Sequence, residues 1–122
     1  MPLVLVTINH DNPYIRKYGI EAGLAFLLRE QVSAVLTCRD PGGELEPDDI
    51  EIQFRDRNPK NDVGGDRYDL QIIVFANEFP DRRKNLGERC VVLNHILERT
   101  YAHLGIHGYT WILLSPAVFV TF

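Results

Sequence analysis

The sequence is poor in the features of secreted or membrane proteins. Only two cysteines occur among 122 residues, too few for a disulfide framework, so we expect a reducing, cytoplasmic location. No uninterrupted apolar run approaches the roughly 18 residues that cross a membrane. The first residues contain neither a cationic segment nor a small-residue cleavage site, so they do not resemble a signal peptide. We therefore expect the folded protein to begin at Pro2.

Positive charge is also scarce. The 13 lysines and arginines stand against 17 aspartates and glutamates, which gives a net charge of −4. The longest cationic run, 82–84, is short and follows an aspartate. A chain with this balance lacks the basic surface that nucleic acids and anionic membranes attract, and we expect neither as a partner.

Metal-ligand patterns are weak as well. His103 and His107 are four residues apart, a spacing that suits a metal site on a helix. Gly105 lies between them and is typical of a helix end, where a histidine is favoured by the helix dipole. We therefore expect no metal site and no cofactor.

The chain does have the composition of a globular domain, with 45% hydrophobic and 25% charged residues. Alternating or continuous apolar residues predict strands, and apolar residues at helical spacing predict helices. The expected order is a strand at 3–8, a helix at 14–36, strands at 50–55 and 69–76, a helix within 77–104 and a strand at 109–115. This order predicts one α+β domain over 1–122: two β-α-β units forming a four-stranded mixed sheet, with two helices on one face. The residues 117–122 predict a short additional C-terminal strand.

An internal repeat supports this division. Shifting the sequence by 67 residues aligns strand with strand and helix start with helix start. Four identities coincide: Leu3 with Leu70, Pro13 with Pro80, Arg16 with Arg83, and Lys17 with Lys84. We therefore divide the domain into two pseudo-repeats, 2–65 and 68–122.

The strands at 3–8 and 69–76 are apolar on both faces, whereas two helices can cover only one face of the sheet. No further segment of the chain remains to cover the other face. We expect another subunit to cover this second face of the sheet. The apolar tail 117–122 would also need a neighbouring strand to pair with. We expect a homo-oligomer formed through the sheet and this tail.

Three features occur together: Pro2 opens a strand, the β-α-β order is doubled, and the segment LEPDDIEIQF is followed by the pair Gly64-Gly65. In these features the chain resembles the tautomerase superfamily, which includes 4-oxalocrotonate tautomerase, 5-carboxymethyl-2-hydroxymuconate isomerase and macrophage migration inhibitory factor. The doubled length is similar to the fused, trimer-forming branch. The resemblance implies a homotrimer that catalyses keto–enol or double-bond isomerisation of a small carbonyl acid, with Pro2 as general base.

The chemistry of such a base is plausible on physical grounds. A free α-amine has a pKa of about 7.7–8.0, and burial or a nearby cation lowers it toward the neutral form. A catalytic base works best when its pKa lies near the operating pH. Retention of Met1 would convert the Pro2 nitrogen into an amide and abolish this role.

The candidate substrate-binding residues are Arg16, Arg55 and Tyr109. Diacid-using members of the family carry an arginine directly after the first strand, where this chain has HDN at 10–12, so that Arg16 is the nearest arginine. A second family arginine lies early in the second strand, whereas Arg55 lies at the far end of that strand here. Tyr109 opens the last strand and either packs in the core or an interface, or polarises a substrate oxygen at a subunit boundary.

Two alternative functions remain open. The same fold could form a catalytically inactive trimer that serves as a binding or scaffold module, which the departures from the family's arginines and a retained Met1 would favour. The β-α-β-β-α-β order also fits a ferredoxin-like ligand-binding domain. That domain requires neither a proline at position 2 nor an apolar second sheet face.

Overall fold

The computed structural model describes residues 2–58, 60, 62–65, 67–116 and 120–122. The strands are β1 (Leu3–Ile8), β2 (Glu51–Asp56), β3 (Leu70–Asn77) and β4 (Gly108–Ser115). The α-helices are α1 (Pro13–Tyr18), α2 (Glu21–Leu36), α3 (Pro80–Lys84) and α4 (Leu86–Tyr101). Two short 3-10 helices, η1 (Pro47–Asp49) and η2 (Ala102–Leu104), complete the described elements.

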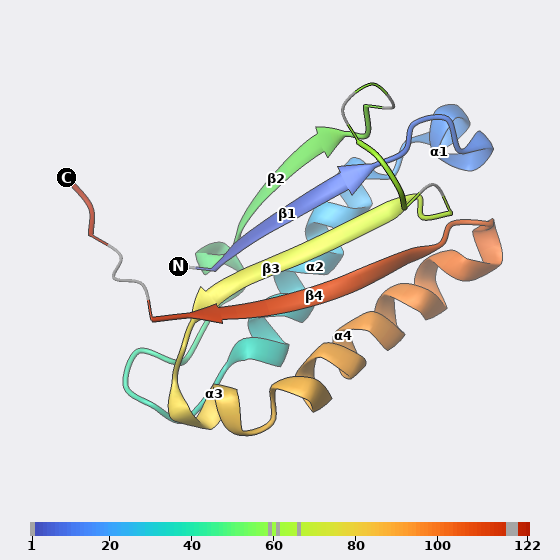
Figure 1. Cartoon of the computed structure of the whole chain (residues 1–122). Helices are drawn as coiled ribbons and strands as arrows, with labels where there is room; N and C mark the ends of the chain where they lie inside the picture. Colours follow the sequence, from blue (N-terminus) through green and yellow to red (C-terminus); the bar gives the residue numbers. More distant parts are fainter. Residues whose placement is uncertain (1, 59, 61, 66, 117–119) are drawn as a thin grey trace.

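The four strands form one mixed sheet in the order β2-β1-β3-β4 (Figure 1). β1 is parallel to β2, β3 is parallel to β4, and the central strands β1 and β3 are antiparallel. The expected α+β fold of two β-α-β units is therefore confirmed. The ferredoxin-like alternative is wrong, because that fold is a split β-α-β arrangement with a strand inserted between the parallel pair, whereas β1 and β2 are adjacent.

The core lies between the sheet and the helices α2 and α4, which cover one face of the sheet (Figure 1). Val4, Val6 and Ile8 of β1 point toward these helices and are fully buried. Leu93 and Leu97 of α4 are buried against the sheet, as apolar residues at helical spacing predict. Among the described residues, no helix is long and apolar enough to span a membrane.

Each expected long helix is broken near its start. The segment predicted as one helix from 14 to 36 is two helices, because Gly19 adopts a left-handed φ of 70° between α1 and α2. Asn12 caps α1, its side-chain oxygen accepting the amides of Tyr14 and Ile15. In the second half, Asn85 separates α3 from α4. The expected stop at Gly105 is confirmed by its left-handed φ of 75°.

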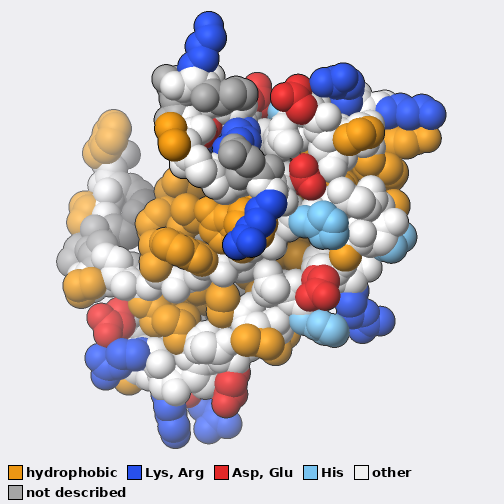
Figure 2. Space-filling model, turned by 45° about the vertical axis from the view of Figure 1, so that its right-hand side comes forward, with side chains coloured by type: hydrophobic (Ala, Val, Ile, Leu, Met, Phe, Trp, Pro, Cys, Tyr) orange, Lys and Arg blue, Asp and Glu red, His pale blue; other side chains and the backbone are white. Residues whose placement is uncertain are grey.

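The second face of the sheet, which we call the open face, carries side chains that alternate with the buried ones. Its apolar members are Leu3, Leu5, Ile73, Phe75, Trp111 and Leu113. Trp111 is 56% exposed and Leu113 is 41% exposed. Figure 2 shows hydrophobic side chains gathered on this side of the molecule, on the left of the view. The two described helices that cover the sheet leave this surface to solvent in a single chain.

The expected C-terminal strand is not found in the part that the structure describes. Residues 117–119 of that segment lie outside the described residues, and 120–122 form no strand. Val120 and Phe122 are highly exposed, and the described residues 120–122 lie away from the sheet (Figure 1). A strand needs a hydrogen-bonded neighbour. Within one chain, the described residues 120–122 pair with no strand.

Candidate active site

Pro2 lies directly before β1 and is buried. Its carbonyl accepts the backbone amide of Glu51 at 3.1 Å, which joins it to the start of β2. Leu3 lies beside Phe75 of the antiparallel strand β3, so Pro2 is at the end of the sheet where β3 terminates. β4 also terminates at this end of the sheet (Figure 1).

Arg55 and Tyr109 lie toward the other end, on the open face. The strand registers place four side chains in one row, with Arg55 beside Thr7, Thr7 beside Gln71, and Gln71 beside Tyr109. Arg55 donates through Nε to the Thr7 hydroxyl at 3.0 Å and through Nη2 to Asp62 at 2.9 Å. The hydrogen bond from Arg55 lowers the pKa of Asp62. Arg55 is therefore held in a fixed orientation across the sheet.

Tyr109 belongs to a row of aromatic rings. Its ring centroid is 5.1 Å from that of Tyr68 and 6.1 Å from that of Trp111, both in edge-to-face geometry. The guanidinium of Arg67 lies 4.9 Å above the Tyr68 ring. Sequence reasoning missed Tyr68, because it lies in a loop and no periodicity connects it with the strand residue that it contacts.

Arg16 lies on α1, beyond the end of β1 opposite Pro2. It forms an ion pair with Asp11 at 3.1 Å, and both side chains are largely exposed. β1 has six residues, which span about 20 Å. The four predicted site residues are therefore not all brought together within one chain: Arg55 and Tyr109 share a row, Arg16 lies at the same end of the sheet, and Pro2 lies at the other end.

A buried arginine fixes the end of the sheet near Pro2. Arg82 is 2% exposed and donates to the carbonyl oxygens of Leu36 at 2.8 Å, Asn77 at 2.9 Å and Gly43 at 3.4 Å. Burial lowers the pKa of this guanidinium. Arg82 thus joins the end of β3 to the end of α2 and to the loop that follows. This role could not be predicted from the sequence, since the run 82–84 is typical of a solvated surface.

The described residues contain no group of three or more His, Cys, Asp or Glu side chains that could hold a metal ion. The imidazole of His10 does lie between two carboxylates, 2.7 Å from Glu21 and 3.0 Å from Asp56. The contacts use Nε2 and Nδ1, which point away from each other on the ring. The three groups therefore form a bridge, with a hydrogen bond to Glu21 and an ion-pair contact to Asp56, and do not surround a common point.

Comparison with known proteins identifies the fold. No protein-family model and no curated protein matches this sequence. Among solved structures, N1, a member of the cis-3-chloroacrylic acid dehalogenase family, is similar with a TM-score of 0.57 and 11% identity, over 93% of this chain and 75% of that chain. FG41 malonate semialdehyde decarboxylase, inhibited by 3-bromopropiolate, has a TM-score of 0.55 and 12% identity, over 93% of this chain and 82% of that chain.

A third structure, MIF2 of Leishmania major, covers 98% of this chain and 93% of its own at 12% identity, but its TM-score of 0.46 is too low to support an argument. The first two similarities confirm the resemblance found in the sequence at the level of the fold. The chain has the fold of the tautomerase superfamily.

Proposed function

We propose that this protein is a tautomerase or isomerase that moves a proton within a small carbonyl acid, with the Pro2 amine as general base. The observation that carries the proposal is the position of Pro2: it immediately precedes a central strand and is buried in a tautomerase-superfamily fold. Removal of Met1 would leave its nitrogen as a free secondary amine. Burial favours the neutral, basic form of such an amine.

The proposed step is a proton transfer without a cofactor. The neutral nitrogen of Pro2 takes a proton from a carbon or hydroxyl group of the substrate, and the electron pair moves into the conjugated system. The protonated amine then returns a proton to the other end of that system, which completes the isomerisation. The five-membered ring fixes the direction of the nitrogen lone pair, so little reorganisation is needed.

A complete site in this proposal needs a second copy of the chain. Tyr109 of the second copy would donate its hydroxyl to the developing oxyanion, a role that hydrogen-bond donors fill efficiently in water-poor sites. The apolar open face supplies the surface for assembly, and we propose a homotrimer formed through it, with the C-terminal tail pairing with a neighbour. An unpaired apolar face of this kind is typical of an interface.

Arg16 and Arg55 are the proposed cations for the substrate carboxylate. Each already pairs with a carboxylate of its own chain, Arg16 with Asp11 and Arg55 with Asp62. A substrate acid would replace or join these partners in a bidentate contact, for which arginine is suited. The names of both similar structures point to acids, one a chloroacrylic acid and the other malonate semialdehyde. These names support an acid as the substrate class.

Two measurements test the proposal. The intact mass of the purified protein determines whether Met1 is removed, and its retention in most molecules would contradict a Pro2 base. Phenylenolpyruvate and 2-hydroxymuconate then serve as substrates for the wild type and for Pro2→Ala. We expect a loss of at least about 100-fold in kcat/KM for Pro2→Ala, the usual range for general-base catalysis. Pro13→Ala, which changes a proline at the start of α1, is the matched control and should keep wild-type activity.

The second candidate function is a catalytically inactive trimer that binds a ligand or another protein. The two ion-paired arginines favour it, because neither is left uncommitted for a substrate acid. A trimer in light scattering that retains Met1 and turns over neither substrate would support this alternative. In both cases we propose a cytoplasmic location, since Cys38 and Cys90 are free thiols.

A further inference from the structure

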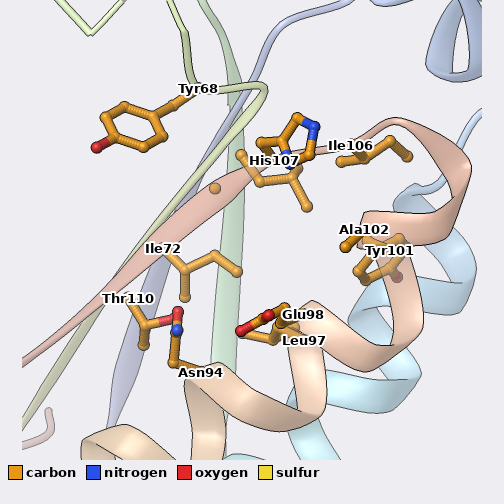
Figure 3. A pocket seen from close by; sticks show the side chains of 12 residues that line it. Tyr68, Ile72, Asn94, Leu97, Glu98, Tyr101, Ala102, Ile106, His107 and Thr110 are labelled. Atoms are coloured by element: carbon orange, nitrogen blue, oxygen red, sulfur yellow. The ribbon is translucent and has the colours of Figure 1, made fainter.

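A pocket of about 380 Å³ lies between β4 and α4, on the helix-covered side of the sheet and away from Pro2 (Figure 3). Its floor is formed by buried apolar residues of the core, among them Leu70, Ile72 and Ile106. Volumes of this size fall in the range of small-molecule sites in proteins. The pocket lies outside the site proposed above.

The pocket exists because β4 presents small side chains toward α4 at this end. Gly108 and Thr110 face the helix here, whereas Ile112 fills the equivalent space farther along the strand. Gly108 cannot be replaced by a larger residue without movement, because an added Cβ would collide with the Leu70 carbonyl oxygen and lie 2.9 Å from the Leu70 Cβ. The close approach of β4 to β3 therefore keeps this part of the pocket open.

Polar groups stand at the rim of the apolar floor. Figure 3 shows the Glu98 carboxylate extending from α4 toward the strands, with His107 on the other side of the opening. In the described part of the chain, neither side chain takes part in a hydrogen bond or ion pair. The Thr110 hydroxyl donates to Asn94 Oδ1 at 3.0 Å, which leaves the Asn94 amide nitrogen as a donor.

The charges of the lining select the kind of ligand. The lining includes the carboxylate of Glu98 but no lysine or arginine. Asp69 adds a second carboxylate beside the opening, since it accepts the backbone amide of His107 at 3.1 Å. An acid would be repelled by the carboxylates of Glu98 and Asp69 here, whereas an ammonium group would gain a charge-assisted hydrogen bond to Glu98. A flat apolar body would lie against the floor.

We propose that this pocket binds a small primary amine with an apolar or aromatic body, with Glu98 as the anchor of the ammonium group and His107 as a second hydrogen-bond acceptor. The proposal does not rest on Pro2, on turnover or on assembly. It assigns a second ligand site whose charge preference is opposite to that of the acid-binding site proposed above.

A titration followed by amide NMR tests this site with three probes that share one body. Phenethylamine is the cation, 2-phenylethanol is the neutral match, and 3-phenylpropionate is the acid. We expect phenethylamine to shift the amides of 94–98 and 106–110 with a dissociation constant on the order of 1 mM or below, as suits a ligand of this size. The alcohol should bind about tenfold more weakly and the acid should not bind at these residues.

Three variants test the role of Glu98 and of the pocket itself. Glu98→Gln should weaken phenethylamine about tenfold and remove its advantage over the alcohol. Glu88→Gln, on the same helix but outside this pocket, should leave the affinity unchanged. Thr110→Leu should fill the pocket and abolish the shifts. The proposal is overturned if the amide signals of the wild type do not shift up to about 10 mM phenethylamine. It is also overturned if all three probes bind the wild type equally, or if Glu98→Gln binds phenethylamine with unchanged affinity. None of these outcomes bears on whether Pro2 is a base.

Discussion

Pro2 and Tyr109 lie at opposite ends of the same sheet. Pro2 precedes Leu3, which lies beside Phe75, whereas Tyr109 lies beside Gln71, four residues earlier on β3. Four residues of strand span about 13 Å, too far for one small substrate to contact both residues in one chain. If both residues act in the same site, two copies of the chain must contribute to it, and this links the proposed chemistry to the proposed assembly.

The assembly can be tested at Trp111, which is 56% exposed and lies at one end of the aromatic row on the open face. Trp111→Glu places a charge where the proposed interface is apolar, and burying an unpaired charge is strongly unfavourable. We expect size-exclusion chromatography with light scattering to show dissociation toward the monomer. Phe26→Glu is the matched control, because Phe26 is 71% exposed on α2, in the helical layer on the opposite side of the sheet. Dissociation of the Phe26 variant alone would contradict assembly through the open face.

Arg82 should contribute strongly to stability. Its replacement in Arg82→Ala removes the donor to three backbone carbonyls and leaves them buried, and we expect a loss of about 3 kcal/mol in the free energy of unfolding. Its neighbour Arg83 is exposed and forms an ion pair with Glu78 at the surface. Arg83→Ala should therefore cost less than about 1 kcal/mol. Urea unfolding of both variants at one protein concentration makes the comparison, and equal losses would show that the Arg82 contacts are not stabilising.

Two glycines should respond oppositely to alanine. At Gly108 the added methyl group meets the Leu70 carbonyl, so Gly108→Ala should destabilise the protein by about 1–3 kcal/mol through overpacking. At Gly87 in α4, no atom lies within 4 Å of the added Cβ. Gly87→Ala should stabilise the protein by about 0.4–1 kcal/mol, since it restricts the unfolded chain and favours the helix. Thermal unfolding of the two variants gives the signs, and a stabilised Gly108→Ala would refute the close approach of the strands.

The bridge at His10 predicts a pH dependence of stability. The hydrogen bond from His10 is the largest cause of the lowered pKa of Glu21 in the folded protein. The pKa of this carboxyl is lower in the folded protein than its unfolded value of 4.5, so its ionised form stabilises the fold above pH 4.5. This contribution to stability is lost as the pH falls through the folded pKa. His10→Ala should therefore flatten the decline of stability below this pH. The difference should be small, under about 1 kcal/mol, because the pair is partly exposed.

Chemical denaturation at several pH values between neutrality and the acid range measures this difference. His103→Ala, which changes a histidine without a carboxylate bridge, is the control and should retain the wild-type slope. An acid decline that is equally steep in His10→Ala would exclude the bridge as its source.

The sheet and its helical cover could be predicted because regular periodicities encode them. The continuous apolar run of β1 is typical of a central strand, and the spacing of Leu93 and Leu97 on α4 is that of a buried helix face. The break at Gly19 was harder to foresee, because an isolated glycine inside an apolar helical pattern usually only lowers helix propensity. Its left-handed φ becomes visible only once the turn between α1 and α2 is built.

The candidate site was less predictable than the fold, because it depends on contacts between distant segments. The row from Arg55 to Tyr109 arises from three strand registers, and no local pattern fixes those registers. The burial of Arg82 depends on carbonyl groups 39–46 positions away in the sequence. Resemblance to a family could indicate Pro2 but could not place it relative to the other candidates.

The central claim is that Pro2 of one copy and Tyr109 of another complete a single site, and mixed assemblies of two inactive variants test it most directly. Pro2→Ala and Tyr109→Ala are unfolded, mixed in equal amounts and refolded together, and tautomerisation of phenylenolpyruvate is measured against each variant refolded alone. Random mixing should restore about a quarter of the wild-type sites, because each site draws its two residues from independent chains. A mixture no more active than the two variants alone, in assemblies shown by mass to contain both chains, would contradict a shared site.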